Sequence, residues 1–337
     1  MRILLIAGGW SSEREVSLRG AAGIAKALAE RGHSVSRFDP AVEFDALLEK
    51  ACTHDVVFIN LHGAPGEDGL IQGMLDRAGC PYQGAGPAAS CLALHKAAAK
   101  QLFRRGGLLT PDWEFLPVPP PVDWQPALPY PLFVKANTGG SSLRLARVEH
   151  EQTLRDALDD IFAAGEEVLL ETAVNGQEVT CGVLGDAALP PVLIQPLEGS
   201  YFNYNSKYRQ GGARELCPAP LPDAVTQHVM ELALKAHRLL GIEGYSRADF
   251  IVPVDGMPCL LEVNTLPGMT TTSLIPQEAA AVGLSFGDLL ERLLELGMRR
   301  KKCITPLPSR RSKPPRSPAR WSFRTRAARN ARCLGHQ

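Results

Sequence analysis

RADFIVPVDGMPCLLEVNTLPGMTTTSL, residues 247–274, holds two apolar runs at 248–254 and 257–263 with Asp255-Gly256 between them. Asp-Gly between apolar runs is a strong signal for a two-residue β-hairpin turn. We therefore predict a pair of antiparallel strands in this stretch.

Three side chains that carry oxygen fall at one end of this hairpin. Asp249 lies near the start of the first strand, and Glu262 and Asn264 share one face of the second because they are two residues apart. Carboxylate and amide oxygens suit Mg²⁺ better than zinc, and Mg²⁺ usually keeps phosphate oxygens in its shell, so the trio predicts a nucleotide nearby. Two solvated acids and a turn asparagine are the alternative for this stretch taken alone.

Charge is distributed unevenly along the 337 residues, a length that predicts two or three domains. The formal net charge is zero, but residues 299–337 hold thirteen Lys and Arg and no acid, which leaves residues 1–298 with 23 basic and 36 acidic side chains. The tail 299–337 is rich in Arg, Pro and Ser, so we expect it to be disordered. It could be a nucleic-acid-binding arm, but the acidic body would repel a polyanion, and we favour a non-functional extension and no nucleic-acid partner.

The cysteines and the apolar segments indicate in which cellular compartment the protein functions. None of the eight cysteines forms a C-x-x-C pair, which indicates reduced thiols without a zinc site or a disulfide framework. The apolar start MRILLIAGG is too short for a signal peptide, and no apolar run approaches the roughly 20 residues of a membrane span. We therefore expect a cytoplasmic protein that has no membrane partner.

The N-terminal part of the chain alternates strands with helices. We predict strands at 2–7, 35–38 and 55–61 and helices at 18–32 and 70–79. This βαβ pattern implies an open parallel sheet that binds ligands at the carboxyl ends of its strands.

Two polar side chains lie at those strand ends. Glu13 follows the turn Gly8-Gly9 and can bind a substrate ammonium, although helix capping by Ser11 and Glu13 would explain the same residues. His62 opens the glycine-rich turn HGAPGEDG at the sheet crevice, where a purely structural histidine is the alternative.

The rest of the chain predicts two smaller α+β units, preceded by a mostly helical stretch at 90–106 that carries Lys96 and Lys100. The first unit follows a Pro-rich connector at 117–131 and contains strands at 132–135, 143–148 and 167–171 and a helix at 151–164. The second contains strands at 179–184 and 192–196, a helix at 224–240, the hairpin and a helix at 286–296. Residues 199–214 have little periodicity and predict a lid loop.

KANTGGSS, residues 135–142, is a glycine-rich turn that follows a strand. Its backbone N–H groups can approach phosphate oxygens closely, and Lys135 adds a positive charge. The spacing is not that of a Walker A loop, and a plain β-turn would look the same. Glu171 can hydrogen-bond an adenine amino group or a ribose hydroxyl, or it can be solvated at a strand end.

Two groups near the hairpin can stabilise negative charge. Arg247 precedes Asp249 by two residues on the same face, where its guanidinium fork can hold a phosphate or an oxyanion. Gly268 and the following Thr and Ser residues can form a nest of N–H donors for an oxyanion or a carboxylate.

Taken together, these motifs resemble those of the D-alanine–D-alanine ligases of the ATP-grasp superfamily. The matching stretches run in order through residues 2–298 and are GGWSSEREVSL (8–18), LHGAPGEDGLIQGMLDRAGCPYQGAG (61–86), LFVKANTGGSS (132–142), FNYNSKY (202–208), SRADF (246–250) and EVNTLPGMTTTSLIP (262–276). Such a set is highly specific, and the tail lies outside it.

The resemblance implies an α/β fold with a three-domain ATP-grasp architecture. Residues 1–92 would form an N-terminal substrate-binding domain with an open parallel sheet, and residues 93–180 a small central α+β subdomain. Residues 181–298 would form a C-terminal α+β subdomain with an antiparallel sheet and the metal site. ATP would be gripped between the central and C-terminal subdomains.

The resemblance also implies a reaction that uses ATP and two Mg²⁺ ions, for which Mn²⁺ can substitute. The carboxylate of one D-alanine would attack the γ-phosphate and give D-alanyl phosphate and ADP. The amine of a second D-alanine would then displace phosphate and give D-alanyl-D-alanine for peptidoglycan precursor synthesis. D-alanine and ATP would be the small-molecule partners, and the family suggests a homodimer formed through the N-terminal domain.

The family's site residues match positions of this chain one by one. The metal ligands match Asp249, Glu262 and Asn264. The ATP-contacting residues match Lys96, Lys135, Glu171, Glu178 and Lys207. The residues around the first D-alanine match Glu13, His62, Ser141 and Tyr208. The oxyanion stabilisers match Arg247 and Gly268, and the pocket for the second substrate's carboxylate matches Ser273 and Leu274.

Several positions near the nucleotide depart from the family pattern. His95 stands where the family usually has Asp, Ala136 where it has Pro, and Arg144 where it has Gly. Thr272 replaces a frequent His and Thr172 a frequent Lys. An Arg in place of Gly disturbs the backbone if φ is positive there.

The same site residues allow two other interpretations of the function. A ligase that joins D-alanine to a hydroxy acid is one, against which Tyr208, the dipeptide-type residue of the family, argues. A catalytically impaired protein that binds ATP or an amino acid is the other. The intact set of predicted metal ligands argues against it, and Arg144 is the residue that favours it.

Overall fold

The computed structural model describes residues 1–140, 143–197, 212–254 and 256–300. Ser141, Lys207 and Tyr208, most of the predicted lid loop and nearly all of the basic tail lie outside these residues. Among the described residues, none of the helices combines the length and the apolar character that crossing a bilayer requires.

Within the described residues, the N-terminal sheet has three parallel strands in the order β2-β1-β3. They are β1 (Arg2–Ala7), β2 (Ser34–Phe38) and β3 (Val56–Asn60), and α1 (Arg14–Glu30) connects the first two. Every residue of β3 is buried, as expected for a parallel strand that is covered on both faces. The predicted open parallel sheet is confirmed, and α1 begins four residues earlier than predicted.

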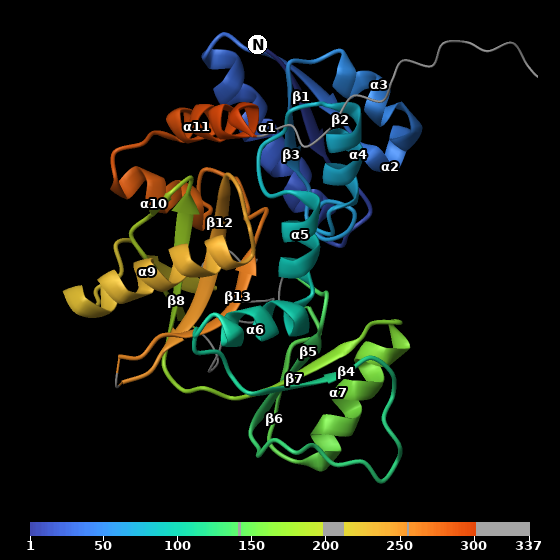
Figure 1. Cartoon of the computed structure of the whole chain (residues 1–337), viewed down its shortest axis with the longest axis vertical. Helices are drawn as coiled ribbons and strands as arrows, with labels where there is room; N and C mark the ends of the chain where they lie inside the picture. The colour runs from blue at the N-terminus through green and yellow to red at the C-terminus, as the bar shows by residue number, and fades with distance from the viewer. Residues whose placement is uncertain (141–142, 198–211, 255, 301–337) are drawn as a thin grey trace, which may run out of the picture. The chain divides into compact units, whose positions relative to one another are not determined.

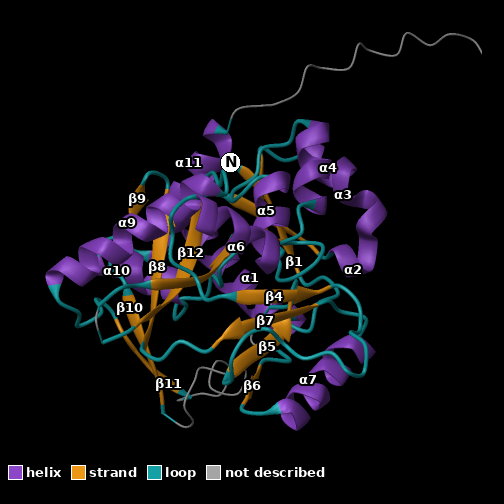
Figure 2. Cartoon of the chain, turned by 60° about the horizontal axis from the view of Figure 1, so that its bottom comes forward, coloured by secondary structure: helices purple, strands orange, loops and turns teal. Residues whose placement is uncertain are grey.

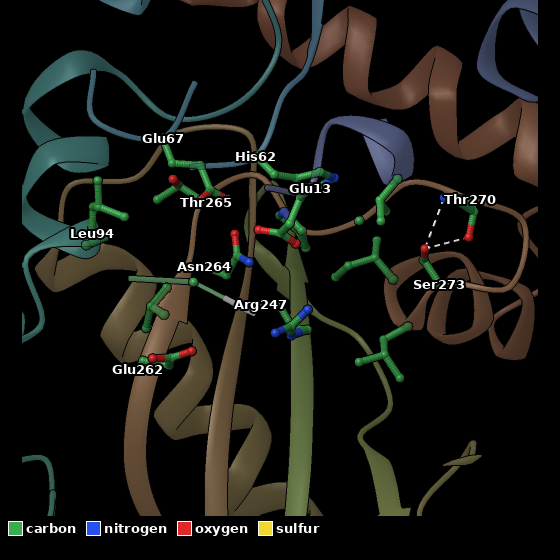
Figure 3. Close-up of a pocket in the computed structure, with 18 of the residues that line it drawn as sticks. Glu13, His62, Glu67, Leu94, Arg247, Glu262, Asn264, Thr265, Thr270 and Ser273 are labelled. Atoms are coloured by element: carbon green, nitrogen blue, oxygen red, sulfur yellow. Dashed lines mark hydrogen bonds between the residues drawn. The ribbon is translucent and has the colours of Figure 1, made fainter. Parts of the chain in front are cut away.

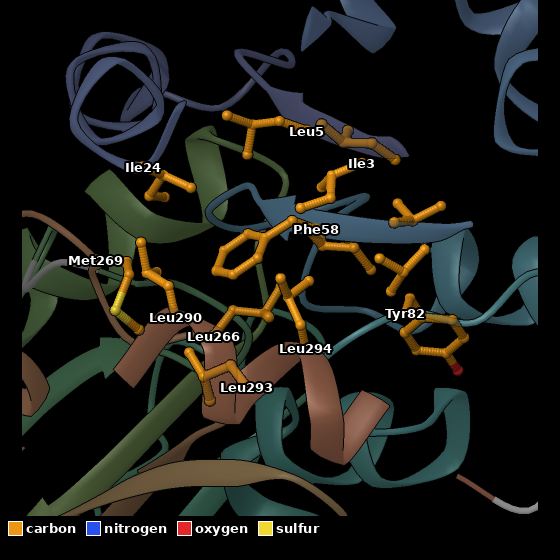
Figure 4. Packing of buried hydrophobic residues seen from close by; sticks show 14 of the residues in the cluster. Ile3, Leu5, Ile24, Phe58, Tyr82, Leu266, Met269, Leu290, Leu293 and Leu294 are labelled. Atoms are coloured by element: carbon orange, nitrogen blue, oxygen red, sulfur yellow. The ribbon is translucent and has the colours of Figure 1, made fainter. Parts of the chain in front are cut away.

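The helix α11 (Phe286–Arg299), near the end of the described chain, packs on this N-terminal sheet. Figure 1 shows α11 beside α1. Figure 4 shows the cluster, which includes Ile3, Leu5, Ile24, Phe58, Leu290, Leu293 and Leu294. A capping box between Ser285 and Asp288 fixes the start of α11. Because both ends of the described chain share one core, residues 1–92 alone do not complete the core around this sheet.

Short helices connect β2 to β3 within the N-terminal sheet and follow β3 toward the rest of the fold. They are α2 (Pro40–Glu43), η1 (Phe44–Ala46), α3 (Leu47–Cys52), α4 (Leu70–Ala78), α5 (Pro87–Leu94) and α6 (Lys96–Arg105). The stretch 90–106, predicted to be mostly helical, is confirmed as such and is divided between α5 and α6, because His95 leaves the helical conformation at φ −81° and ψ 88°. The break places Lys96 at the first position of a new helix.

In the described residues, the central sheet is antiparallel with the order β4-β7-β5-β6. Its strands are β4 (Trp113–Leu116), β5 (Leu132–Ala136), β6 (Ala146–Val148) and β7 (Val168–Thr172). The helix α7 (Glu151–Ala163) lies beside this sheet (Figure 2), and its residues Leu154, Leu158 and Ile161 are buried in the cluster that the two share. The predicted small α+β unit is therefore present, with β4 as an additional strand.

The C-terminal sheet is antiparallel and, in the described residues, has the order β11-β10-β8-β12-β13 with β9 paired to β8. The strands are β8 (Gln177–Leu184), β9 (Ala187–Ala188), β10 (Val192–Pro196), β11 (Ala213–Leu216), β12 (Tyr245–Val252) and β13 (Cys259–Asn264). The helix α9 (Asp223–Leu239) packs on this sheet, and α10 (Leu274–Ala281) follows the hairpin. A domain boundary between residues 180 and 181 falls inside β8.

The central hairpin is confirmed, but its turn is longer than predicted. β12 and β13 pair with Asp249 opposite Glu262 and Arg247 opposite Asn264. The strands end at Val252 and resume at Cys259, because Pro253 and Pro258 have no N–H group to donate to the ladder. The prediction of a two-residue turn is therefore wrong, while the register that brings the polar side chains together is present.

Candidate active site

Two cavities adjoin the hairpin. The first has a volume of about 680 Å³, and Figure 3 shows Glu13 and His62 on one side of it and Arg247 and Glu262 on the strands opposite. The second has a volume of about 530 Å³ and is lined from both antiparallel sheets. The residues that line both cavities are Lys96, Gly139, Gly140, Arg247, Glu262 and Leu274. The two cavities therefore adjoin at this shared wall.

The second cavity has apolar walls and charged groups at their edge. Its apolar residues come from facing strands of the two sheets and include Phe133, Leu193, Ile194, Ile251 and Leu261. Lys135, Glu171, Glu178 and Asp249 line it as well. Apolar walls with a few placed polar groups are typical of a site for a small molecule.

Glu171 lies between two ammonium groups at the edge of this cavity. Its side chain is nearly fully buried, with Lys100 Nζ 2.8 Å from Oε1 and Lys135 Nζ 2.7 Å from Oε2. Burial alone would raise the pKa of Glu171, but the two lysines hold that pKa below its usual value. Both carboxylate oxygens are thus engaged, and the predicted role of Glu171 toward adenine stays a prediction.

The start of α6 is held by the glycine-rich turn. The N–H of Lys96 donates to the carbonyl oxygen of Asn137 at 3.1 Å, and the N–H of Ala97 donates to Asn137 Oδ1 at 3.0 Å. The N–H of Ala98 donates to His95 Nδ1 at 3.2 Å. These bonds satisfy N–H groups that a helix start leaves open, and they bring Lys96 close to the turn that begins at Lys135.

The ammonium of Lys96 connects this turn to the hairpin. It donates to the carbonyl oxygen of Gly139 and lies 3.5 Å from Glu262 Oε2. Asn137, which is fully buried, was not predicted as a site residue because an asparagine in a glycine-rich turn is an ordinary sequence feature. Lys100 was named in the sequence without a role, and its burial could not be read from a helix with an otherwise basic face.

The three predicted metal ligands share one face of the hairpin. Asp249 Oδ1 accepts from the hydroxyl of Thr180 at 2.6 Å, and Asn264 Oδ1 accepts from the N–H of Leu266 at 2.9 Å. The described residues contain no group of three or more His, Cys, Asp or Glu side chains that could hold a metal by themselves. Two carboxylates and an amide fit Mg²⁺ in the manner of sites where phosphate oxygens supply much of the coordination.

Arg247 forms a bidentate pair with Asp249 and lines both cavities. Its Nε lies 2.8 Å from Oδ1 and its Nη2 2.7 Å from Oδ2. Burial would lower the pKa of this guanidinium, but Asp249 keeps that pKa above its ordinary value, so the group is permanently charged. A fixed positive charge therefore stands where the two cavities meet.

Residues from the N-terminal sheet line the first cavity. Glu13 stands at the start of α1 but makes no side-chain capping bond, so capping by its carboxylate is not its role. His62 is mostly buried and also lines the cavity. Glu67 lines it too and accepts from the N–H of Gly63 at 2.9 Å, although the sequence reasoning passed over it within HGAPGEDG.

The start of α10 forms the far end of the first cavity. Ser273 is the residue that precedes the helix, and its Oγ accepts from the N–H of Thr270 at 3.0 Å. Ser273 and Leu274 line the cavity together with Gly268. The partial positive charge at a helix start favours a carboxylate at this place.

The departures from the family pattern have distinct structural outcomes. Arg144 has φ 53°, so the backbone disturbance expected for an Arg at this position is present. Its guanidinium pairs with Glu166 at 3.1 Å. His95 takes over a capping role at α6. Thr272 lines the first cavity and Thr172 the second.

Comparisons with known proteins cover most of the chain. The chain matches the family model described as D-ala D-ala ligase C-terminus over residues 119–295 and the one described as D-ala D-ala ligase N-terminus over residues 39–85. It is 65% identical over 298 residues to a D-alanine–D-alanine ligase of Nitratidesulfovibrio vulgaris, which covers 88% of this chain and 98% of that protein.

Solved structures are similar over the same part of the chain. A D-alanine–D-alanine ligase from Bacillus anthracis complexed with ATP aligns with a TM-score of 0.79 and 32% identity, covering 89% of this chain and 98% of that one. The VanG D-Ala:D-Ser ligase from Enterococcus faecalis aligns with a TM-score of 0.74 and 27% identity, covering 88% and 99%.

Proposed function

The chain belongs to the D-alanine–D-alanine ligase family, and we propose that it joins two D-alanine molecules at the expense of ATP. The products are D-alanyl-D-alanine, ADP and phosphate, and the dipeptide serves peptidoglycan precursor synthesis. The wall shared by the two cavities carries the proposal. It offers a path for a phosphoryl group from a nucleotide in one cavity to a carboxylate in the other.

The second cavity would hold ATP. The base would lie between the apolar walls, with Glu171 and Glu178 on its side, and the phosphates would lie toward Lys96 and Lys135. Lys207, in the lid loop, would add a further contact when the loop closes. Lysines and backbone N–H groups that surround a triphosphate hold it in line for attack.

Asp249, Glu262 and Asn264 would hold two Mg²⁺ ions, for which Mn²⁺ can substitute. When bound, the ions supply charge neutralisation on the phosphates and lower the repulsion of an attacking carboxylate. Arg247 lies beside Asp249 and orients that ligand through its bidentate pair.

The first cavity would hold both amino acids. Glu13 would bind the ammonium of the first D-alanine in a network with Ser141 and Tyr208, near His62. Attack of its carboxylate on ATP gives D-alanyl phosphate, and the amine of the second D-alanine then attacks this carbonyl. Arg247 and the N–H of Gly268 would stabilise the oxyanion that forms. Ser273 and Leu274 would hold the second carboxylate at the start of α10.

Membership of the family also suggests the domain division, the oligomeric state and the cellular location. We propose the three-domain division of the family, with a homodimer formed through the N-terminal domain and a cytoplasmic location. The course of β8 supports a boundary between the central and C-terminal subdomains before Gln177 instead of after residue 180. We expect no nucleic-acid or membrane partner.

The reaction can be tested with the full-length protein, ATP, Mg²⁺ and D-alanine. We expect one phosphate released per dipeptide detected by mass spectrometry, and no release with L-alanine. A D-lactate arm that gives an ester product in place of the dipeptide would identify a hydroxy acid ligase. ATP binding without D-alanine-dependent phosphate release would reject the ligase function in favour of a nucleotide-binding protein.

The metal assignment has its own test. Glu262→Gln should abolish turnover and leave the melting temperature unchanged, because Glu262 is partly exposed and lines both cavities. Glu30→Gln, an exposed glutamate on α1, is the matched control and should turn over normally. Normal turnover by the Glu262 variant would reject the metal assignment.

A further inference from the structure

Lys100 is a fully buried ammonium that the ligation chemistry does not use. It lies on α6 one turn after Lys96, and its side chain has no exposed surface. Its Nζ donates to Thr110 Oγ1 at 2.6 Å and lies 2.8 Å from Glu171 Oε1. An ammonium taken out of water is costly unless it is paired and hydrogen-bonded, and Lys100 has both kinds of partner.

The two lysines on Glu171 stand in different surroundings. Lys135 lines the second cavity and retains some exposed surface, whereas Lys100 lies behind the carboxylate. With both lysines charged, the three groups carry one net positive charge at the wall of the cavity. Such a charge in a partly buried cleft attracts an anion.

We propose that Lys100 is a positioning residue for ATP, which keeps Glu171 paired so that Lys135 can turn from this carboxylate to the phosphates. The proposal rests on the proposed function, because there Lys135 is assigned to the phosphates. It assigns a role to Lys100, which reaches no substrate and acts through Glu171 alone.

The electrostatics of the three groups explain the role. If Lys100 were neutral, Lys135 and Glu171 would form a pair without net charge. Moving Lys135 to a phosphate would then leave a buried carboxylate with neither ammonium, and breaking a buried ion pair in this way is strongly unfavourable. With Lys100 in place, Glu171 keeps a partner at 2.8 Å after Lys135 has moved.

Lys100→Met tests the proposal because it removes the charge and keeps an unbranched stem. We expect the dissociation constant of ATP, measured by calorimetry on the full-length protein, to rise roughly tenfold or more. The dissociation constant of adenosine, which has no phosphate, should stay within about twofold. In turnover assays, KM for ATP should rise more than kcat falls.

A double-mutant cycle isolates the path through Glu171. In the Glu171→Gln background, Lys100→Met should cost much less ATP affinity than in the wild type, because no buried carboxylate then remains to be kept paired and only the loss of one positive charge near the cavity is left. This comparison also serves if the Lys100→Met single variant does not fold, since removing both charges together avoids an unpaired buried group. Melting temperatures of all four proteins provide the fold control.

Two results would overturn the proposal. One is an equal loss of affinity for ATP and adenosine, and the other is a loss in the Glu171→Gln background as large as in the wild type. ATP binding is measured without D-alanine, so its outcome is separate from that of dipeptide formation. A wild-type protein that binds ATP and makes no dipeptide would reject the ligase function and leave the Lys100 test intact.

Discussion

Arg144 combines an unfavourable backbone conformation with weak compensation. Its φ of 53° lies in the left-handed region, which costs a residue with a Cβ roughly 1–2 kcal/mol. Its guanidinium pairs with Glu166 at 3.1 Å and Asp160 at 3.6 Å, but these groups are partly exposed, where such pairs contribute about 0–1 kcal/mol. The glycine that the family usually has at this position would avoid the cost.

Arg144→Gly should therefore raise the free energy of unfolding by roughly 0.5–1 kcal/mol, as measured by urea denaturation. Arg147→Gly is the matched control, because Arg147 lies in β6 with ordinary strand geometry and should lose stability on the same change. A loss of stability in both variants would show that the backbone conformation at Arg144 is not strained.

Glu278 is a buried carboxyl in α10 whose pKa lies well above its ordinary value because of burial. Its Oε1 accepts from the N–H of Gly182 at 3.0 Å, and Oε2 has no hydrogen-bond partner among the described residues. Since the folded-state pKa is raised, this group stabilises the fold fully below its unfolded-state pKa. The stability is lost as pH rises from there through the folded-state pKa.

Glu278→Gln should remove this pH dependence. Above the unfolded-state pKa, the wild type should lose about 1.4 kcal/mol per pH unit relative to the variant until the carboxyl ionises in the fold. Melting temperatures between mildly acidic and mildly alkaline pH measure the effect, with Glu30→Gln as an exposed control. Parallel curves for the wild type and Glu278→Gln would mean that Glu278 is ionised in the folded protein.

Residues with local partners could be predicted from the sequence, and residues with distant partners could not. Arg247 and Asp249 share a strand face by spacing alone, and the hairpin brings Glu262 opposite Asp249. Lys100 and Asn137 act through segments far along the chain, which no spacing rule encodes. The carboxylate of Glu171 was predicted near the nucleotide, but its double lysine pairing depends on how β7 packs beside α6.

At the scale of elements, the start of α6 contacts both the glycine-rich turn and, through Lys96, the hairpin. Asn137 contributes its backbone carbonyl and Oδ1 to the helix start, and its Nδ2 donates to Glu167 Oε2 at 2.9 Å. His95, which stands where the family has Asp, supplies its ring Nδ1 as the acceptor in place of a carboxylate. The replacement thus preserves the cap that fixes Lys96.

Exchanging the donor and the acceptor of the hydrogen bond between Asn137 and Glu167 tests whether this bond holds the start of α6. Asn137→Asp should destabilise the protein by about 1–3 kcal/mol and raise KM for ATP, because it places a second carboxylate against Glu167. Adding Glu167→Gln should restore both quantities, since the bond then runs from the amide at 167 to the carboxylate at 137. The measurements are urea denaturation and steady-state kinetics.

The exposed pair Gln152 and Asp156 on α7 offers a matched control. Gln152→Glu places two carboxylates together in the same way, but in solvent, and should change stability by less than about 0.5 kcal/mol. If the Asn137→Asp/Glu167→Gln protein stayed as impaired as the single variant, Asn137 would not act through this bond.

Helices and strands whose apolar residues recur at a regular spacing were predicted from the sequence. Two short strands without fully buried residues were not. The strands β4 and β11 have four residues each and contain no fully buried residue, so they have no alternation to read. The helix α10 was not predicted, because the residues after Gly268 were interpreted only as a nest of N–H donors, although serine, here Ser273, is favoured at the position before a helix. The break at His95 depends on the distant Asn137.

At the scale of the molecule, Arg300 ties the end of α11 to two other parts of the fold. Its guanidinium lies 4.3 Å from the ring centroid of Tyr82, donates to the carbonyl oxygen of Gly84 at 3.3 Å and lies 3.3 Å from Glu243. Arg300 therefore packs with the folded part of the chain, although the predicted basic tail begins at residue 299.

Deleting residues 301–337 should leave dipeptide formation and the melting temperature unchanged. Arg300→Ala in the full-length chain should lower the free energy of unfolding by about 1–2 kcal/mol through the lost cation–π and hydrogen-bond contacts. Turnover and thermal unfolding are measured for the truncated protein and for the Arg300→Ala protein. A large loss of turnover on truncation alone would give the tail a function in the reaction.

The packing of α11 on β1 and β3 has a consequence for biosynthesis. The first strand of the N-terminal sheet leaves the ribosome long before the leucines of α11 are made. At the usual 5–20 residues per second, Ile3 and Phe58 wait on the order of 10–60 s for their last partners. During that time the apolar face of the sheet lacks this cover, so its maturation depends on keeping that face from aggregating until α11 has been made.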